Sequence, residues 1–126
     1  MPAYFKIDKE RRLVMSTWSD VVTRADAFAH QENLRKHPDF DRSFSQLVDL
    51  SHVTRIEFTH EDVEWFARAT IFSPNSRRAI LAPADLVFGL ARMFEILRDT
   101  VGEKGIRVFR NLEDALEWVL GKNTEP

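Results

Sequence analysis

The chain alternates short runs of β-forming residues with longer segments of helical periodicity. Residues 4–8 and 13–18 are rich in strand-forming side chains, and the polar tetrapeptide 9–12 separates them, which predicts a β-hairpin. Three more short apolar runs predict strands at residues 46–50, 79–82 and 106–109.

Capping residues mark the helices between these strands. Thr23 is a typical N-cap and begins a helix expected to end near residue 37, because Pro38 follows. Thr59 begins a second helix, expected to reach residue 70 or 71. The third helix is expected over residues 85–101 and is closed by Gly102. The last helix is expected to run from its cap Asn111, with Asp114 three residues later, to Gly121.

The resulting order ββαβαβαβα predicts an α/β fold with a single mixed, mostly parallel sheet of about five strands. The opening hairpin supplies the antiparallel strand. We expect one domain over residues 1–121 and a frayed tail over 122–126, because no linker or internal repeat divides the chain.

Composition excludes several classes of function. The 18 basic and 20 acidic side chains are balanced, which argues against a nucleic-acid-binding surface and against a polybasic membrane surface. The 126 residues include no cysteine, so disulfides and thiolate sites are excluded. The first dozen residues lack the apolar run of a signal peptide, and no apolar stretch is long enough to insert in a membrane. We expect a cytoplasmic protein.

Several segments resemble a known family. Residues 49–57, DLSHVTRIE, resemble the strand-to-helix segment of STAS domains, the fold of anti-sigma-factor antagonists, where it reads roughly D-L-S-x-V-x-x-I-D-S-S-G. Residues 80–83, 88–93 and 108–118 resemble the SpoIIAA-like group, bacterial proteins related to that fold and to lipid-binding Sec14-type domains. The resemblance spans most of the chain and implies a STAS-like fold.

The same resemblance makes Thr59 a candidate phosphoacceptor. In the antagonists, a partner kinase phosphorylates a serine just before the glycine of the motif, and Thr59 occupies the matching position. Phe58 replaces the first serine and His60 replaces the glycine, so the motif is altered on both sides. The alternative is that Thr59 only caps its helix.

Asp49, Ser51 and Phe88 are candidates for a ligand crevice. Asp49 and Ser51 are expected at the carboxyl end of a parallel strand, the edge where open α/β sheets bind ligands. Asp49 alternatively caps the loop with its side chain. Phe88 is an aromatic residue on the polar face of its helix, and either lines the crevice or packs under the preceding loop.

Trp65, Ala69 and Phe72 are candidates for an interface. Spaced i, i+4 and i+7, they form an apolar stripe beside the core face of the helix that Thr59 begins. The apolar arc is wider than a surface helix needs, so either loops or a partner cover Trp65. The simplest partner is a second copy in a two-fold homodimer.

No catalytic, metal or cofactor site is predicted. His30, His37, His52 and His60 form no i, i+4 pair, and a site from His52, Glu57 and His60 has no metal-binding spacing, so we expect exposed histidines. Arg77 and Arg78 are anion-binding candidates, with a solvated turn as the alternative. The chain has no Gly-rich phosphate loop and no G-x-S-x-G elbow, so no cofactor and no enzyme activity are expected.

Two functions follow. The first is a non-catalytic, STAS-like interaction or regulatory module that acts through protein–protein contacts. The alternative is a binder of a small apolar or lipid-like ligand at the carboxyl edge of the sheet. An enclosed apolar pocket would favour the ligand, and a flat surface with exposed Trp65 would favour the protein partner.

Overall fold

The structure, a computed structural model, describes residues 3–101 and 105–121. The expected tail at 122–126 and the expected helix stop at Gly102 lie outside the described residues. A single sheet has the order β1-β2-β3-β4-β5. β1 is antiparallel to β2 and every other pair is parallel, which confirms the mixed, mostly parallel sheet. The strands are β1 Ala3–Asp8, β2 Leu13–Thr23, β3 Ser45–Glu57, β4 Arg78–Leu81 and β5 Ile106–Phe109.

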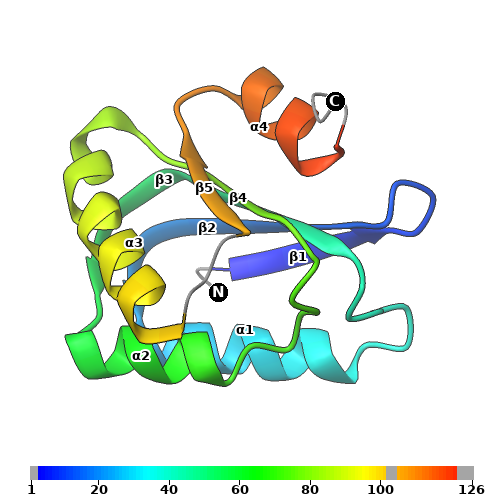
Figure 1. Ribbon diagram of the computed structural model, residues 1–126, viewed down its shortest axis with the longest axis horizontal. Coiled ribbons are helices and arrows are strands. Elements are labelled where there is room, and N and C mark those ends of the chain that lie inside the picture. The colour runs from blue at the N-terminus through cyan, green and yellow to red at the C-terminus, as the bar shows by residue number, and fades with distance from the viewer. Residues whose placement is uncertain (1–2, 102–104, 122–126) are drawn as a thin grey trace.

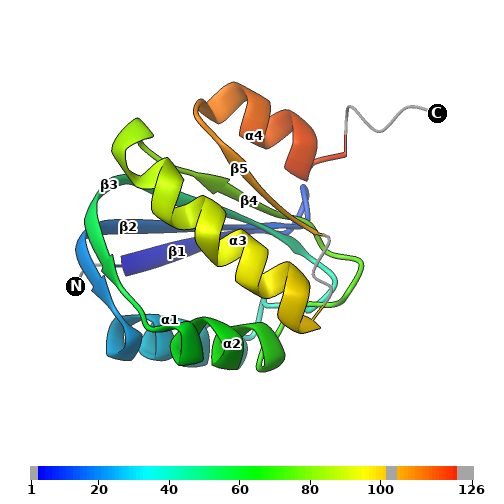
Figure 2. The same ribbon diagram turned by 60° about the vertical axis from the view of Figure 1, so that its left-hand side comes forward.

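Helices cover both faces of this sheet. α1 and α2 lie on one side and α4 on the other (Figure 1). Figure 2 shows α3 running along the sheet toward α2, which it contacts. The helices are α1 Arg24–Lys36, α2 His60–Arg68, α3 Val87–Val101, after a short 3₁₀ turn at Ala84–Leu86, and α4 Leu112–Val119.

The expected starts of α1, α2 and α4 are confirmed by their caps, whereas α3 begins at Val87, two residues later than expected, after the 3₁₀ turn. Thr23 and Thr59 each form a capping box, in which the hydroxyl accepts from the backbone N–H three residues later and the Asp there accepts from the backbone N–H of the threonine. Asn111 accepts from the backbone N–H of Asp114, and Gly121 follows α4 with a φ of 76°. These helix starts depend on contacts within one turn, so the local sequence determines them.

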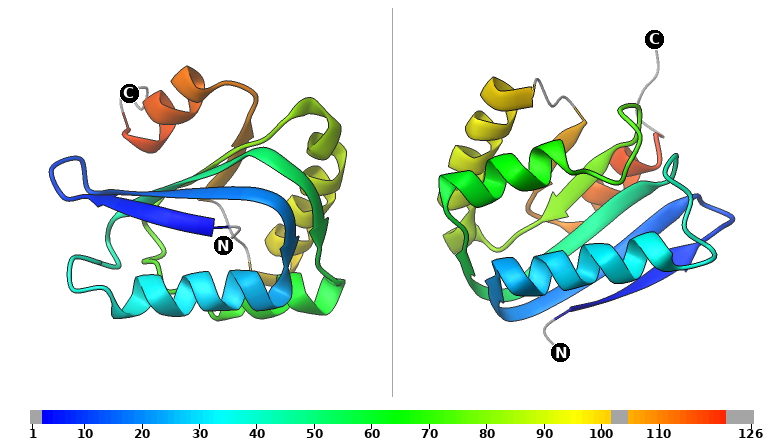
Figure 3. Two further views of the ribbon diagram at one scale, coloured as in Figure 1. Left: turned by 180° about the vertical axis from the view of Figure 1, so that it is seen from behind. Right: turned by 90° about the horizontal axis from the view of Figure 1, so that it is seen from below.

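β2 and β3 are much longer than the sequence indicated. β2 continues past residue 18 and β3 continues past residue 50, because the two strands pair with each other beyond the end of β4. Register shifts after Thr17 and after Asp20, which has a φ of 60°, accompany a bend of this ribbon toward α1 (Figure 3). Asp49 and Ser51 therefore lie within β3, and not at its carboxyl end as expected.

α2 is shorter than predicted. It ends at Arg68 with Ala69 as its C-cap, so Thr70 and Phe72 are not helical. The hydroxyl of Thr70 accepts a hydrogen bond from the backbone N–H of Phe72, at 3.2 Å. Such local bonds compete with helical hydrogen bonds, which accounts for the early end.

Side-chain alternation in the strands divides the core between the two faces. Leu47 and Ala79 point toward α4 and pack with Ala115 and Val119. On the opposite face Val14 packs against Leu34 of α1, in a cluster separate from the α4 core. No helix among the described residues is long and apolar enough to cross a bilayer.

Candidate functional site

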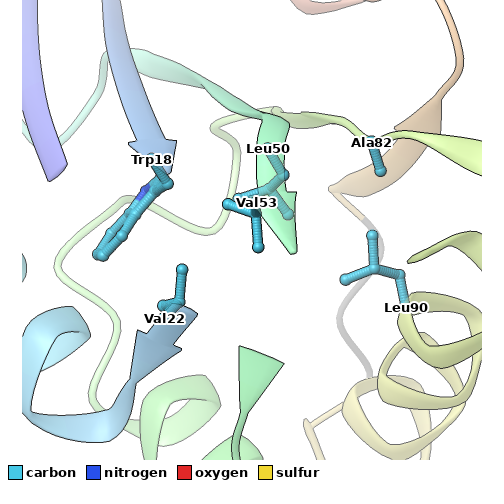
Figure 4. Close-up of a cluster of buried hydrophobic side chains, with 6 residues drawn as sticks. All are labelled: Trp18, Val22, Leu50, Val53, Ala82 and Leu90. Carbon is cyan, nitrogen blue, oxygen red and sulfur yellow. The ribbon is translucent and has the colours of Figure 1, made fainter. Parts of the chain in front are cut away.

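The face covered by α1, α2 and α3 holds a cavity of about 250 Å³. The bend of β2 and β3 and the packing of α3 against α2 bring its walls together. Figure 4 shows Trp18 and Val22 of β2, Leu50 of β3 and Leu90 of α3 in one buried cluster, and all four line the cavity. The remaining apolar lining comes from Ala27, Leu34, Val48, Ile56, Phe58, Phe66, Ile71, Phe72, Ile80 and Met93.

A few polar side chains are contiguous in the cavity wall. Arg78 is the register partner of Gln46, and its Nη2 donates to Oγ1 of Thr70 at 2.9 Å. The Arg78 guanidinium lies 5.3 Å from the Phe72 ring centroid. Nearby, Gln31 Nε2 donates to the carbonyl oxygen of Ala69 at 2.8 Å. Among the described lining residues Arg78 is the one permanent charge, so the rest of the wall is neutral and mostly apolar.

His30 also lines the cavity, contrary to the expectation of an exposed histidine. Its side chain lies on α1, and the residue is only 8% exposed. The imidazole stacks on Phe5 with centroids 5.5 Å apart and lies 4.8 Å from the Trp18 ring. Its Nε2 is buried without a hydrogen-bond partner among the described residues. Burial lowers the pKa of His30 to about 4, so the imidazole is neutral at pH 7.

Helical periodicity could have identified this residue. Ala27, His30, Gln31 and Leu34 follow the i, i+3, i+4, i+7 spacing of one helix face, and all four line the cavity. A polar side chain on that inward face is the signal of a buried histidine, and metal-type spacing does not reveal it.

The three residues expected to form a ligand crevice do not line the cavity. The Asp49 carboxylate accepts from the backbone N–H of Ser51 at 2.9 Å and from its hydroxyl at 2.6 Å. Phe88 is 74% exposed, and the Arg92 guanidinium lies 5.8 Å from its ring. Phe88 therefore does not pack under the preceding loop.

Thr59 is exposed at the start of α2, and its hydroxyl accepts from the backbone N–H of Asp62 at 3.1 Å. The Asp62 carboxylate accepts from the backbone N–H of Thr59 at 3.0 Å. The threonine is thus the helix cap. Its phosphorylation stays a prediction from the family resemblance.

The expected interface stripe is divided by the early end of α2. Trp65 is 38% exposed and packs against Phe28 of α1, with centroids 5.8 Å apart. Ala69 is the C-cap of the helix and is half-buried. Phe72 is only 6% exposed and packs edge-on against Phe40, so its placement on an outer stripe was wrong. The exposed aromatic pair is Phe28 with Trp65.

The remaining candidates have structural contacts. Arg77 Nη1 donates to the carbonyl oxygen of Trp118 at 2.6 Å, and its guanidinium lies 5.3 Å from that indole, so Arg77 is not in a solvated turn. Within the described part of the chain no three His, Asp or Glu side chains are grouped to hold a metal ion, and His52, Glu57 and His60 are not gathered.

Comparison with known proteins supports the fold. No family model and no curated protein matches the chain. It is similar to the crystal structure of an uncharacterized protein from Shewanella loihica PV-4, of the DUF3478 family, with a SpoIIAA-like fold. The match has a TM-score of 0.62 and 17% identity, and covers 93% of each chain. This chain therefore has a SpoIIAA-like fold, as the sequence resemblance implied.

Proposed function

We propose that the chain is a non-catalytic, cytoplasmic module that binds a small, largely apolar ligand in the cavity between α1, α2, α3 and the sheet. The observation that carries this proposal is the mostly apolar cavity of about 250 Å³. An enclosed apolar cavity of roughly 150 Å³ holds benzene, and this one, which is partly open to solvent, has room for a body of about two fused rings. The proposed site lies under the helices, and not at the carboxyl edge considered from the sequence.

The expected affinity follows from the buried area. Covering about 200 Å² of an apolar ligand contributes roughly 5 kcal/mol, at about 25 cal/mol per Å². This free energy corresponds to a dissociation constant on the order of 0.1–1 mM before the costs of association, and specific polar contacts add to it. The cavity by itself supports weak binding of unfunctionalised hydrocarbons and tighter binding of a ligand matched to its polar groups.

Two variants on one helix test the proposal. Ala27 lines the cavity, whereas Ala25, two residues earlier on α1, is exposed and outside it. We expect ¹H–¹⁵N NMR titration with naphthalene to shift amides around the cavity in the wild type. Ala27→Leu should weaken binding at least about tenfold by filling space, and Ala25→Leu should leave it unchanged. No shifts up to saturating naphthalene, or equal binding by Ala27→Leu, would refute the proposal.

The outer face of α1 and α2 favours a second candidate function, regulatory protein contact. Phe28 is 43% exposed and Trp65 is 38% exposed, and the two rings touch. Arg24 lies 5.6 Å from the Trp65 ring and pairs with Asp62 at 3.1 Å. Such a combination of aromatic and arginine side chains is typical of interface centres. A second copy of the chain is the simplest partner.

A further inference from the structure

His30 lines an apolar cavity, and its Nε2 has no hydrogen-bond partner within the described part of the chain. Buried polar atoms are nearly always paired, and leaving one unpaired costs on the order of 1–3 kcal/mol. His30 Nε2 is such an atom in a residue that is only 8% exposed. An apolar side chain at position 30 would pack against Phe5 and Trp18 without that cost. The imidazole is therefore best explained by a partner that binds next to it.

The surroundings of His30 favour a neutral ligand group next to its ring. Phe5 and Trp18 are its ring contacts, and both are uncharged. Asp26 lies with His30 along a neighbouring hollow, but its carboxylate already accepts from the backbone N–H of Thr23 at 3.2 Å. An ionic ligand group placed against these rings would lose its hydration, which is costly, and the one permanent charge among the described lining residues, the Arg78 guanidinium, already donates to Oγ1 of Thr70.

A hydroxyl suits either form of the neutral ring. Neutral imidazole has one N–H donor and one acceptor nitrogen, and the tautomer decides which of them is Nε2. A hydroxyl both donates and accepts, so it can pair with Nε2 in both tautomers. A carbonyl or an ether oxygen can pair with only one.

The aromatic side chains in the cavity wall favour a planar ligand. Trp18, Phe58, Phe66 and Phe72 line the cavity, and the Phe58 and Phe66 rings are stacked with centroids 5.5 Å apart. Flat aromatic side chains pack well against flat rings in offset or edge-on geometry. A planar ligand thus makes more contact in this space than a flexible chain of equal volume.

We propose, on the basis of the ligand-binding function above, that the cavity takes a neutral aromatic alcohol of about two fused rings, whose hydroxyl hydrogen-bonds to Nε2 of His30. Because Nε2 is shielded from solvent, this hydrogen bond requires the imidazole to turn toward the cavity when the ligand binds. In the turned position Nε2 gains a hydrogen bond. A ligand that carries the hydroxyl should therefore bind more tightly than the same hydrocarbon without it.

The test compares 2-naphthol with naphthalene by NMR titration and calorimetry. For the wild type we expect 2-naphthol to bind about tenfold more tightly, the equivalent of about 1.4 kcal/mol. His30→Phe keeps an aromatic ring and removes Nε2, so the two probes should then bind about equally. His52→Phe is the control, because His52 is exposed and outside the cavity, and it should keep the tenfold preference.

A second measurement needs no variant. The ¹⁵N shifts of the His30 imidazole in the wild type should move with 2-naphthol and stay nearly constant with naphthalene. Equal binding of the two probes by the wild type, or a preference that survives in His30→Phe, would overturn the hydroxyl assignment and leave the ligand-binding function standing. Failure of both probes to bind would overturn that function, and the hydroxyl assignment with it.

Discussion

The burial of His30 makes the stability of the protein depend on pH in a defined direction. Burial lowers the pKa of His30 from 6.5 to about 4, so the folded state holds the neutral ring while the unfolded chain binds a proton more readily. The contribution of His30 to the free energy of unfolding is therefore fully present above about pH 6.5. It is lost progressively as the pH falls toward 4.

The magnitude follows from the two pKa values. One pKa unit corresponds to about 1.4 kcal/mol, so the full loss below pH 4 is about 3 kcal/mol. Between pH 7 and pH 5 the expected loss is about 2 kcal/mol, which is a large part of the stability of a small domain. The Asp8 carboxyl contributes little in this window, because its pKa is lowered from 3.8, chiefly by a hydrogen bond from the backbone N–H of Arg11, so its effect lies at lower pH.

Urea denaturation at pH 7 and pH 5, followed by far-ultraviolet circular dichroism, measures this effect. Wild type should lose about 2 kcal/mol more than His30→Phe between the two pH values, because the variant has no ring to protonate. His52→Phe should keep the wild-type pH dependence, since His52 is exposed. An equal loss in wild type and His30→Phe would refute the reasoning, and would mean that His30 is accessible to protons in the folded state.

Three further outcomes are expected. Trp65→Glu should give a folded monomer where the wild type is a dimer at tens of micromolar, and a monomeric wild type in sedimentation equilibrium would exclude the homodimer. Thr59→Ala should lower the free energy of unfolding by about 1 kcal/mol while Thr59→Asp retains it, and an unchanged urea midpoint for Thr59→Ala would contradict the capping role. Arg77→Gln should lower the free energy of unfolding by about 1 kcal/mol, because Arg77 loses its contacts with Trp118. Arg35→Gln removes only an exposed ion pair and should lower it less, and thermal unfolding of both variants measures the difference.

The element order and the helix starts were determined by the sequence alone. Thr23, Thr59 and Asn111 each bond to a backbone N–H three residues later, so all the atoms involved belong to one turn of chain. The alternation of strands and helices then led to the mixed sheet, because parallel strands need helical crossovers. The family resemblance pointed to the same SpoIIAA-like fold, which the structural match supports.

The extent of the strands and the contents of the site were decided only by the tertiary structure. β3 reaches Glu57 because β2 lies beside it and supplies hydrogen bonds that no local pattern reveals. Phe72 is buried because the chain leaves α2 early and returns against Phe40. His30 is neutral, and its Nε2 has no hydrogen-bond partner among the described residues, because Phe5 and Trp18, distant in sequence, pack against its ring. A cavity is the space that several such elements leave between them, so it depends on packing across the whole fold and not on any one segment.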